Sequence, residues 1–201
     1  NGEGLQHQDG HSHILANTIP NCKSYDATYA YELAVIIQDG LERMYGKKEN
    51  FFYYITTMNE NYNHPSIPEG VEQGIIAGVY KVDSTKLTKH KKKSINVNLM
   101  GAGTILHEVI AASKILADDY SITSDIWSLT SINELVRDGQ EIDRWNMLNP
   151  EKNKKMAYIE RILEDSNGPF VIATDYMKAY GEQLRKYIPD DLHVLGTDGF
   201  G

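Results

Sequence analysis

Cysteine is scarce in this sequence, and long apolar runs are absent from it. Cys22 is the only cysteine among the 201 residues, so no disulfide bond can form within the chain. Such a chain suits a reducing compartment, and a cytoplasmic location is expected. No run approaches the ~18 apolar residues that a membrane-spanning helix needs, and no basic and apolar leader opens the chain. We therefore expect no membrane partner.

An excess of positive charge is also lacking. The chain carries 20 Lys and Arg against 28 Asp and Glu, which gives a net charge of −8. Because nucleic-acid binding depends on clustered basic residues, no nucleic-acid partner is expected, and the short basic run 89–93 is interpreted as a solvated loop. The hydrophobic fraction of 41% and charged fraction of 24% are ordinary for a globular protein with one large domain or two small ones.

Glycine, histidine and carboxylates are concentrated at the start of the chain. Residues 2–13 contain three of the seven histidines, His7, His11 and His13, together with Asp9 and three glycines. Glycine permits backbone conformations that other residues avoid, and imidazole exchanges protons near neutral pH. The stretch is therefore typical of a site loop rather than a core strand.

Three interpretations of this stretch remain open. On an extended segment His11 and His13 would lie on one side, where His7 and Asp9 could complete a metal shell, although the sequence offers no second cluster of ligands. A polar surface loop is the second interpretation. Contact of His7 and its neighbours with a substrate or cofactor is the third.

The first half of the chain predicts a helix and a strand after this stretch. Asp26 is the expected N-cap of a helix over 27–45, whose apolar face would contain Ala30, Leu33, Ala34, Ile37, Leu41 and Met44. The aromatic and β-branched run 51–57 predicts a buried strand. Asn59 to Tyr62 follow that strand directly, where both a capped turn and contact with a ligand are open.

Strands and helices alternate from residue 94 onward. A short helix over 69–77 and a strand over 79–82 precede the regular part. The predicted strands are 95–100, 125–129, 170–174 and 193–195, and the predicted helices are 104–118, 132–137, 155–164 and 176–187. This alternation predicts an α/β fold with a mostly parallel sheet and helices on both faces.

Other glycines, acids and histidines are interpreted as structural. Gly101-Ala102-Gly103 favours a tight turn over a dinucleotide fingerprint, because Leu106 stands where a third glycine is required. Asp138-Gly139 and Asp198-Gly199 favour turns over acid or base sites. His107 and His193 are expected to be packed or solvated.

Longer motifs extend over almost the whole chain. They are NGEGLQHQDGHSH at 1–13, TIPNC at 18–22, DGLERMYG at 39–46, YITT at 54–57, NENY at 59–62, RDGQ at 137–140, RWNML at 144–148, TDYMK at 174–178 and GTDGFG at 196–201. Together they resemble the homodimeric bacterial pyruvate dehydrogenases, whereas Asp-Gly-x-x-His alone would indicate only the wider transketolase-like superfamily.

The resemblance implies a division into two domains. Residues 1–66 would be the end of the family's middle domain, which is of the pyrimidine-binding type. Residues 67–201 would be a transketolase-like C-terminal domain that is truncated at its end. The chain would then be a fragment that lacks a long N-terminal part and a short C-terminal tail.

The resemblance also implies an activity. It is oxidative decarboxylation of pyruvate with thiamine diphosphate and Mg²⁺, followed by transfer of the acetyl group to the lipoyl group of the acetyltransferase component. Both cofactors would be bound mainly by parts missing from this chain, which alone would be inactive. A transketolase-like enzyme acting on sugars and a non-catalytic interaction module of the same fold are the alternatives.

The resemblance assigns site residues as well. His7 matches the family's active-site histidine in Gly-Leu-Gln-His and would contact the substrate and donate a proton. His13 matches the superfamily's substrate-facing histidine in Asp-Gly-x-x-His and is the second catalytic candidate. Asp9 and His11 would bind the substrate or support the histidines.

Overall fold

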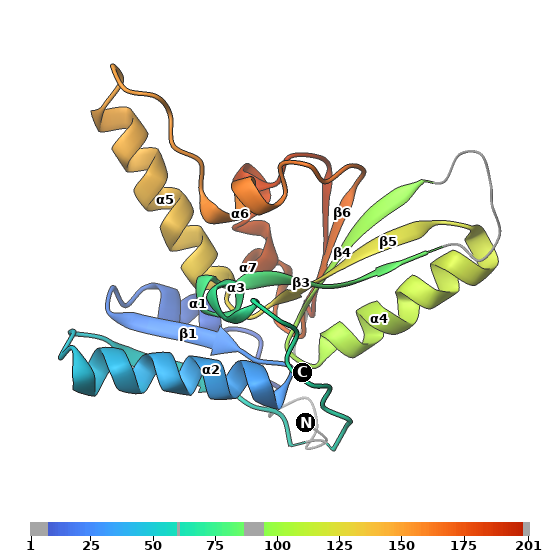
Figure 1. Cartoon of the computed structure of the whole chain (residues 1–201), viewed down its shortest axis with the longest axis horizontal. Coiled ribbons are helices and arrows are strands. Elements are labelled where there is room, and N and C mark those ends of the chain that lie inside the picture. Colours follow the sequence, from blue (N-terminus) through green and yellow to red (C-terminus); the bar gives the residue numbers. More distant parts are fainter. Residues whose placement is uncertain (1–7, 60, 87–94, 199–201) are drawn as a thin grey trace.

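A five-stranded sheet forms the centre of the larger part of the molecule (Figure 1). The computed structural model describes residues 8–59, 61–86 and 95–198. The strand order across the sheet is β3 (Val79–Thr85), β5 (Thr123–Leu129), β4 (Asn96–Ala102), β6 (Phe170–Ala173) and β7 (Leu192–Leu195). β4, β5, β6 and β7 are mutually parallel, and β3 runs antiparallel to β5. The predicted α/β fold with a mostly parallel sheet is confirmed.

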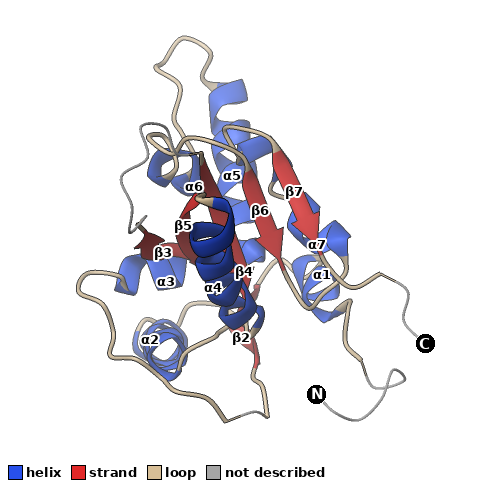
Figure 2. Ribbon diagram, turned by 90° about the vertical axis from the view of Figure 1, so that its right-hand side faces the viewer, coloured by secondary structure: helices blue, strands red, loops and turns tan. Residues whose placement is uncertain are grey.

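Helices cover both faces of this sheet. Figure 2 shows α4 (Ile105–Ile115) in front of the strands and α5 (Ile132–Leu148) behind them. Neighbouring residues of β4 point to opposite faces, as the pleat of a strand requires. Leu99 packs with Leu106 and Val109 of α4, whereas Met100 belongs to the core beneath α5, α6 (Tyr158–Ile162) and α7 (Lys178–Glu182). The sheet is therefore buried on both sides.

A smaller parallel sheet precedes the large one in the chain. After α1 (Ser12–Asn17), β1 (Cys22–Asp26) pairs with β2 (Phe52–Thr56), and α2 (Ala30–Leu41) connects the two strands. α2 continues as a π-helical turn over Glu42–Gly46. The short helix α3 (Glu72–Ala77) then leads into β3. None of the described helices is long and apolar enough to cross a membrane.

The structure corrects the prediction for α2. Asp26 is the last residue of β1 rather than a helix N-cap, and the helix begins at Ala30 with Tyr29 as its N-cap. Most of the predicted apolar face is exposed: Ile37 is 45% exposed and Leu41 54%. The buried positions are Glu32, Ile36 and Gly40, because Ile36 packs with Tyr25, Ile75 and Tyr80, and Gly40 lies against the Tyr53 ring.

Other differences concern single elements. β1 was not predicted, and the predicted buried strand β2 is present but partly exposed, with Phe52 at 43%. α5 extends to Leu148, so Trp145 and the Asp138-Gly139 pair lie inside a helix rather than in a connection or a turn. Ser131 caps this helix by accepting a hydrogen bond from Glu134 N–H. The predicted helix over 176–187 is divided into α7 and a 3₁₀ turn at Arg185–Tyr187.

Glu32 joins the smaller sheet to the larger one. This carboxylate is completely buried, and Oε2 accepts hydrogen bonds from the N–H groups of Thr28 and Tyr29 at 2.6 and 2.8 Å. Oε1 accepts from the hydroxyls of Tyr80 on β3 and Ser128 on β5 at 2.6 and 2.7 Å. Four donors from three separate segments therefore meet on one side chain.

We predict that Glu32→Gln destabilises the protein. The amide would place an N–H group against at least one of the four donors, and an unsatisfied buried donor costs roughly 1–3 kcal/mol. We expect the free energy of unfolding, measured by urea titration, to fall by about that amount. Glu42→Gln at an exposed position of the same helix is the control and should change it by about 0.5 kcal/mol or less. Equal stabilities of the two variants would contradict the assignment.

Candidate functional site

The segment from Asp9 to His13 leads into α1 through a hydrogen-bonded turn. Asp9 Oδ1 accepts hydrogen bonds from the N–H groups of His11 and Ser12 at 3.1 and 3.0 Å, and Oδ2 accepts one from the Ser12 hydroxyl. Partial burial acts to raise the pKa of Asp9, but the hydrogen bonds from Ser12 prevail and hold it below its ordinary value. Asp9 is thus an ionised group that fixes the start of the helix.

His13 lies in the first turn of α1 and is completely buried. Its Nε2 is 3.0 Å from the Thr56 hydroxyl on β2. Its ring is packed edge-on against Tyr176 at 4.7 Å and stacked on Tyr180 at 5.3 Å, centre to centre. Burial lowers the pKa of His13 to about 4, although the nearby Asp9 acts to raise it. The imidazole is therefore neutral at pH 7.

Asp26 is the last residue of β1, and the Thr56 hydroxyl links it to His13. The Thr56 hydroxyl donates a hydrogen bond of 2.7 Å to Asp26 Oδ1. Oδ2 lies against the backbone of Gly103, and a Cβ atom on Gly103 would be only 2.5 Å from it. Gly103 also has a φ of +55°, which glycine adopts readily. Burial raises the pKa of Asp26 to about 7, and the carboxylates of Asp175, Glu32 and Asp9 contribute.

Asp26 was not recognised as a site residue from the sequence. Its position after a strand was a usable signal, because ligand sites in parallel α/β sheets gather at the carboxyl ends of strands. The strand itself was missed, since Pro20 and Asn21 at its start suggested a break.

Two other motifs meet the His13 segment. The N–H of Met177, in the motif TDYMK, donates to Gly10 O at 3.2 Å. Thr197, in the motif GTDGFG, donates its N–H to Tyr176 O at 2.9 Å, and Asp198 accepts from the Lys178 N–H. Residues far apart in the sequence thus converge where β6 and β7 end.

Tyr62, the last residue of the NENY motif, contacts α4 and the segment before α2. The Tyr62 hydroxyl donates to Thr28 O, and its ring packs 4.4 Å from that of His107. His107 is a packing residue, as expected, and His193 on β7 is exposed.

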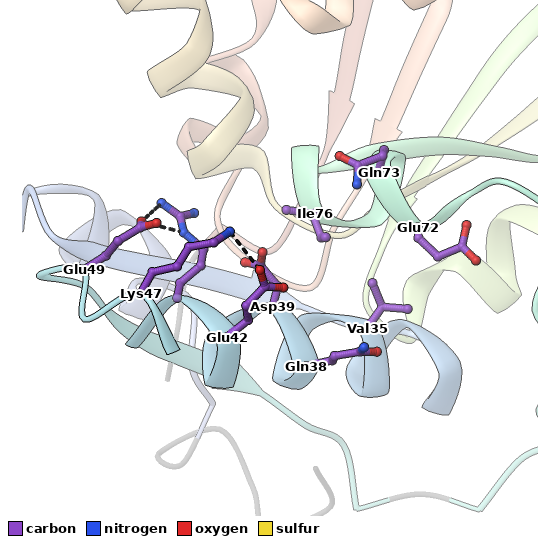
Figure 3. A pocket seen from close by; sticks show the side chains of 10 residues that line it. Val35, Gln38, Asp39, Glu42, Lys47, Glu49, Glu72, Gln73 and Ile76 are labelled. Atoms are coloured by element: carbon purple, nitrogen blue, oxygen red, sulfur yellow. Dashed lines mark hydrogen bonds and ion pairs between the residues drawn. The ribbon is translucent and has the colours of Figure 1, made fainter. Parts of the chain in front are cut away.

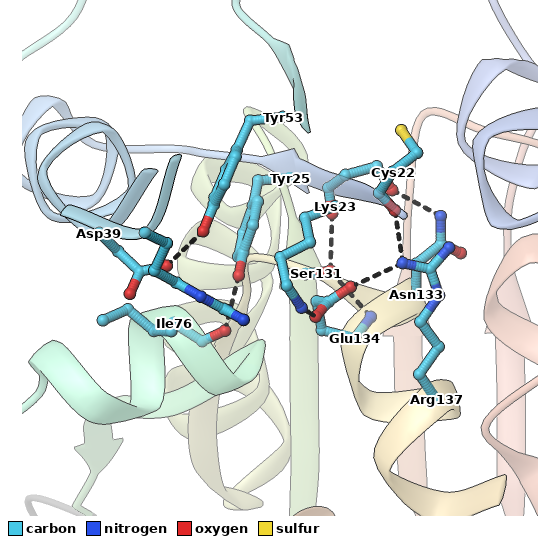
Figure 4. Close-up of polar contacts among 12 residues, drawn as sticks. Cys22, Lys23, Tyr25, Asp39, Tyr53, Ile76, Ser131, Asn133, Glu134 and Arg137 are labelled. Carbon is cyan, nitrogen blue, oxygen red and sulfur yellow. Dashed lines mark hydrogen bonds and ion pairs between the residues drawn. The ribbon is translucent and has the colours of Figure 1, made fainter. Parts of the chain in front are cut away.

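Polar side chains at the N-terminal end of α5 contact β1 and His13, and Figure 4 shows the contacts with β1. Asn133 donates hydrogen bonds from Nδ2 to His13 O at 2.7 Å and to Ser24 Oγ at 2.5 Å. Ser131 Oγ donates to Ser24 O at 2.7 Å. Lys23 and Arg137 both pair with Glu134, and Arg137 also donates to Cys22 O. β1 is therefore fixed to α5 by a continuous polar network.

The sequence candidates do not all lie in the described structure. His7 lies outside the described residues. Asp9 and His11 are exposed, with His11 as the N-cap of α1, and so His11 and His13 are not alternating residues of an extended segment. No group of three or more His, Cys, Asp or Glu side chains in residues 8–59, 61–86 and 95–198 is placed to hold a metal.

A polar cavity of about 720 Å³ lies elsewhere, between α2, the π-helical turn and α3 (Figure 3). Its charged side chains are Asp39, Glu42, Arg43, Lys47, Glu49 and Glu72. The bases pair with neighbouring acids, Arg43 with Glu49 at 2.6 Å and Lys47 with Glu42 at 2.9 Å. None of the residues around His13 lines this cavity, so it is separate from the candidate site.

Comparison with known proteins assigns both parts of the chain. The family of the pyruvate dehydrogenase E1 component middle domain matches residues 1–65. The family of the transketolase-like TK C-terminal domain matches residues 78–201. The chain is 57% identical over its whole length to the pyruvate dehydrogenase E1 component of Escherichia coli K12 and 53% identical to that of Pseudomonas aeruginosa. It spans 22% of the length of each of these relatives.

A solved structure shows the same fold. Transketolase from Campylobacter jejuni matches with a TM-score of 0.59 over 98% of this chain and 25% of that one. The sequences are 15% identical, so this likeness concerns the fold alone.

We predict that Asp26→Asn changes how stability depends on pH. Burial raises the pKa of Asp26 from its ordinary value of 3.8 to about 7, so the folded state keeps this proton to higher pH than the unfolded state. The stability that this proton provides is present below pH 4 and is lost as the pH rises to about 7. The free energy of unfolding falls by ~4 kcal/mol at most over this range. Asp26→Asn should remove this decline between pH 4 and 7, measured by thermal unfolding.

The exposed Asp119→Asn provides the control for that series. It should retain the wild-type slope, because its side chain is solvated in both states. His13 acts in the opposite direction: its stability contribution is lost as the pH falls from 6.5 towards 4. An Asp26→Asn protein whose stability still declined like the wild type would refute the assignment.

Proposed function

Because the chain belongs to the transketolase-like C-terminal domain family, we propose that it is part of a thiamine-diphosphate-dependent pyruvate dehydrogenase E1 component. The observation that carries this proposal is the 47–57% identity to such components, which extends over the complete chain. The proposed reaction is oxidative decarboxylation of pyruvate with reductive acetylation of the lipoyl group of the acetyltransferase component. Residues 1–66 would belong to the middle domain and 67–201 to the C-terminal domain.

The proposed protein is a homodimer in the bacterial cytoplasm. Thiamine diphosphate would supply the carbanion chemistry at the keto carbon of pyruvate, and Mg²⁺ would bind its diphosphate. From the family resemblance, both cofactors are proposed to be bound mainly by parts of the protein outside this chain. The part of the chemistry proposed for this chain is substrate contact and proton transfer.

His7 is the proposed proton donor. An imidazole with an ordinary pKa near 6.5 can hold and release a proton at neutral pH. His13 is suited to a different task, because it is buried and neutral and its Nε2 is engaged by Thr56. We therefore propose that His13, Asp9 and His11 place the segment that leads from His7, and that His13 reaches the substrate only indirectly.

A transketolase-like activity on sugars is the second candidate. Sugar phosphates require Arg or Lys side chains near the substrate. The described groups nearest to His13 are instead the rings of Tyr54, Tyr176 and Tyr180 and the hydroxyl of Thr56, and none of these is cationic. The third candidate, a non-catalytic module, has no observation in its favour.

We predict that His7→Ala lowers lipoyl-dependent acetyl transfer in the full-length protein. Loss of a positioned proton donor typically lowers the rate by roughly 10²–10⁴-fold. Binding of thiamine diphosphate should be nearly unchanged, because its anchors are assigned to other parts of the protein. Acetyl transfer from pyruvate and cofactor affinity, measured by fluorescence titration, check the two expectations.

His193→Ala is the matched control for this substitution. His193 is exposed on β7, and its loss should leave acetyl transfer at the wild-type rate. A His7→Ala protein with wild-type turnover would refute the role of His7. A wild-type protein that processed a sugar phosphate but not pyruvate would refute the proposed function itself.

A further inference from the structure

The Thr56 hydroxyl lies where three segments of the candidate site meet. Thr56 is the last residue of β2 and stands opposite Asp26 in the parallel pairing with β1. Its Oγ1 is 2.7 Å from Asp26 Oδ1, 3.3 Å from Tyr25 O and 3.0 Å from His13 Nε2. One hydroxyl thus links the ends of both strands to the first turn of α1.

The single proton of the Thr56 hydroxyl determines which ring nitrogen of His13 carries a proton. A threonine hydroxyl has a single proton, and both the Tyr25 carbonyl and an ionised Asp26 can only accept one. The carboxylate is the nearer acceptor and forms the stronger, charge-assisted bond. Above about pH 7, where Asp26 is ionised, Thr56 therefore accepts from His13, and Nε2 carries the imidazole proton. Nδ1 then holds a lone pair; it is buried and has no hydrogen-bond partner among the described residues.

The surrounding rings leave the imidazole little freedom. Tyr176 meets it edge-on at an interplanar angle of 85°, and Tyr180 stacks on it at 18°. Tyr54, from β2, lies 5.6 Å from the ring centre. Aromatic packing of this kind confines the plane of the ring but does not distinguish one nitrogen from the other. The only described hydrogen bond of the ring, from Nε2 to Thr56, makes that distinction.

His13 is also the anchor of the segment before it. Its carbonyl accepts from Asn133 of α5, and Gly10 O accepts from Met177 N–H of the motif TDYMK. Both of these bonds attach the segment to the larger part of the molecule. The bond to Thr56 attaches it to β2 of the smaller sheet. The orientation of the segment towards the smaller sheet therefore depends on Thr56.

We propose that Thr56 is a positioning residue for the candidate active site, and that Asp26 assists it by accepting its proton. Thr56 acts through His13: it fixes the ring in one tautomer and one orientation, and thereby the segment that leads from His7. The inference deepens the proposed function and rests on it for the catalytic consequence. The arrangement of the hydrogen bonds does not depend on that function.

The first test compares Thr56→Val with Thr56→Ser in the full-length protein. Valine has nearly the shape of threonine but no hydroxyl, whereas serine keeps the hydroxyl. A misplacement of about 1 Å can cost roughly 10²-fold in rate, so we expect Thr56→Val to lower kcat for pyruvate-dependent acetyl transfer at least about tenfold. The KM for pyruvate should stay within about threefold, because the Thr56 hydroxyl is engaged by Asp26 and His13. Thr56→Ser should restore most of kcat.

The second test measures thermal unfolding from pH 6 to pH 8.5 and needs no activity. The titratable groups that face Asp26 are the carboxyl groups of Asp9, Glu32 and Asp175 and the hydroxyls of Tyr176 and Tyr180. His13 is linked to Asp26 through Thr56. Loss of the Thr56 hydroxyl removes the hydrogen bond that lowers the pKa of Asp26. The melting temperature of Thr56→Val should therefore fall more steeply with rising pH than that of the wild type and Thr56→Ser.

The outcomes separate this inference from the proposed function. The positioning role would be overturned if Thr56→Val had the wild-type kcat, or if Thr56→Ser lost as much of kcat as Thr56→Val. In both cases the proposed function would stand as long as the wild-type protein turned over pyruvate. An equal drop in melting temperature at every pH would show that the hydroxyl only fills space and would also overturn it. If Thr56→Val fails to fold, Thr56→Ala removes the same hydroxyl with less crowding of Asp26, and the same outcomes apply.

Discussion

A buried carboxylate, that of Glu32, holds the two parts of this molecule together. A charge without solvent is tolerated only where hydrogen-bond donors replace the water, and Glu32 has four. Burial raises its pKa, while the hydroxyls of Tyr80 and Ser128 and the two N–H groups act to lower it. The same group closes the start of α2 and reaches two strands of the large sheet, so the position of β1 and β2 follows from it.

The candidate site is built on that junction. Asp26 and Thr56 end the two strands whose place Glu32 helps to determine, and His13 is packed between Thr56 and the tyrosines of the C-terminal part. His13 and Asp26 are buried, and electrostatic effects are strong in such an interior. Asp26 keeps its proton to about pH 7, and His13 gives up its proton near pH 4. Between these values both groups are neutral, which lowers the cost of burying them side by side.

This arrangement supports the different roles that are proposed for His13 and His7. His13 is removed from solvent and has a defined tautomer, so it is suited to hold the chain in place and not to exchange protons with a substrate. A proton donor needs an accessible imidazole with a pKa near neutrality, and that role is proposed for His7. Reaction rates depend strongly on how accurately a reactive group is placed, so such a group is usually held by rigid neighbouring residues.

The sequence alone determined the alternation of strands and helices from residue 94 onward, because each element buries apolar residues with its own period. Its motifs also predicted that residues 9–13 belong to a site, and the fold places the motif TDYMK beside them. The sequence did not reveal that Ile37 and Leu41 are exposed while Glu32 is buried, because burial depends on which face meets the rest of the molecule. Nor did it identify Asp26 and Thr56, which are 30 residues apart and become one hydrogen-bonded unit only when β1 pairs with β2. The pKa values of Asp26 and His13 were decided in the same way, since desolvation is a property of the packed interior and not of any single residue.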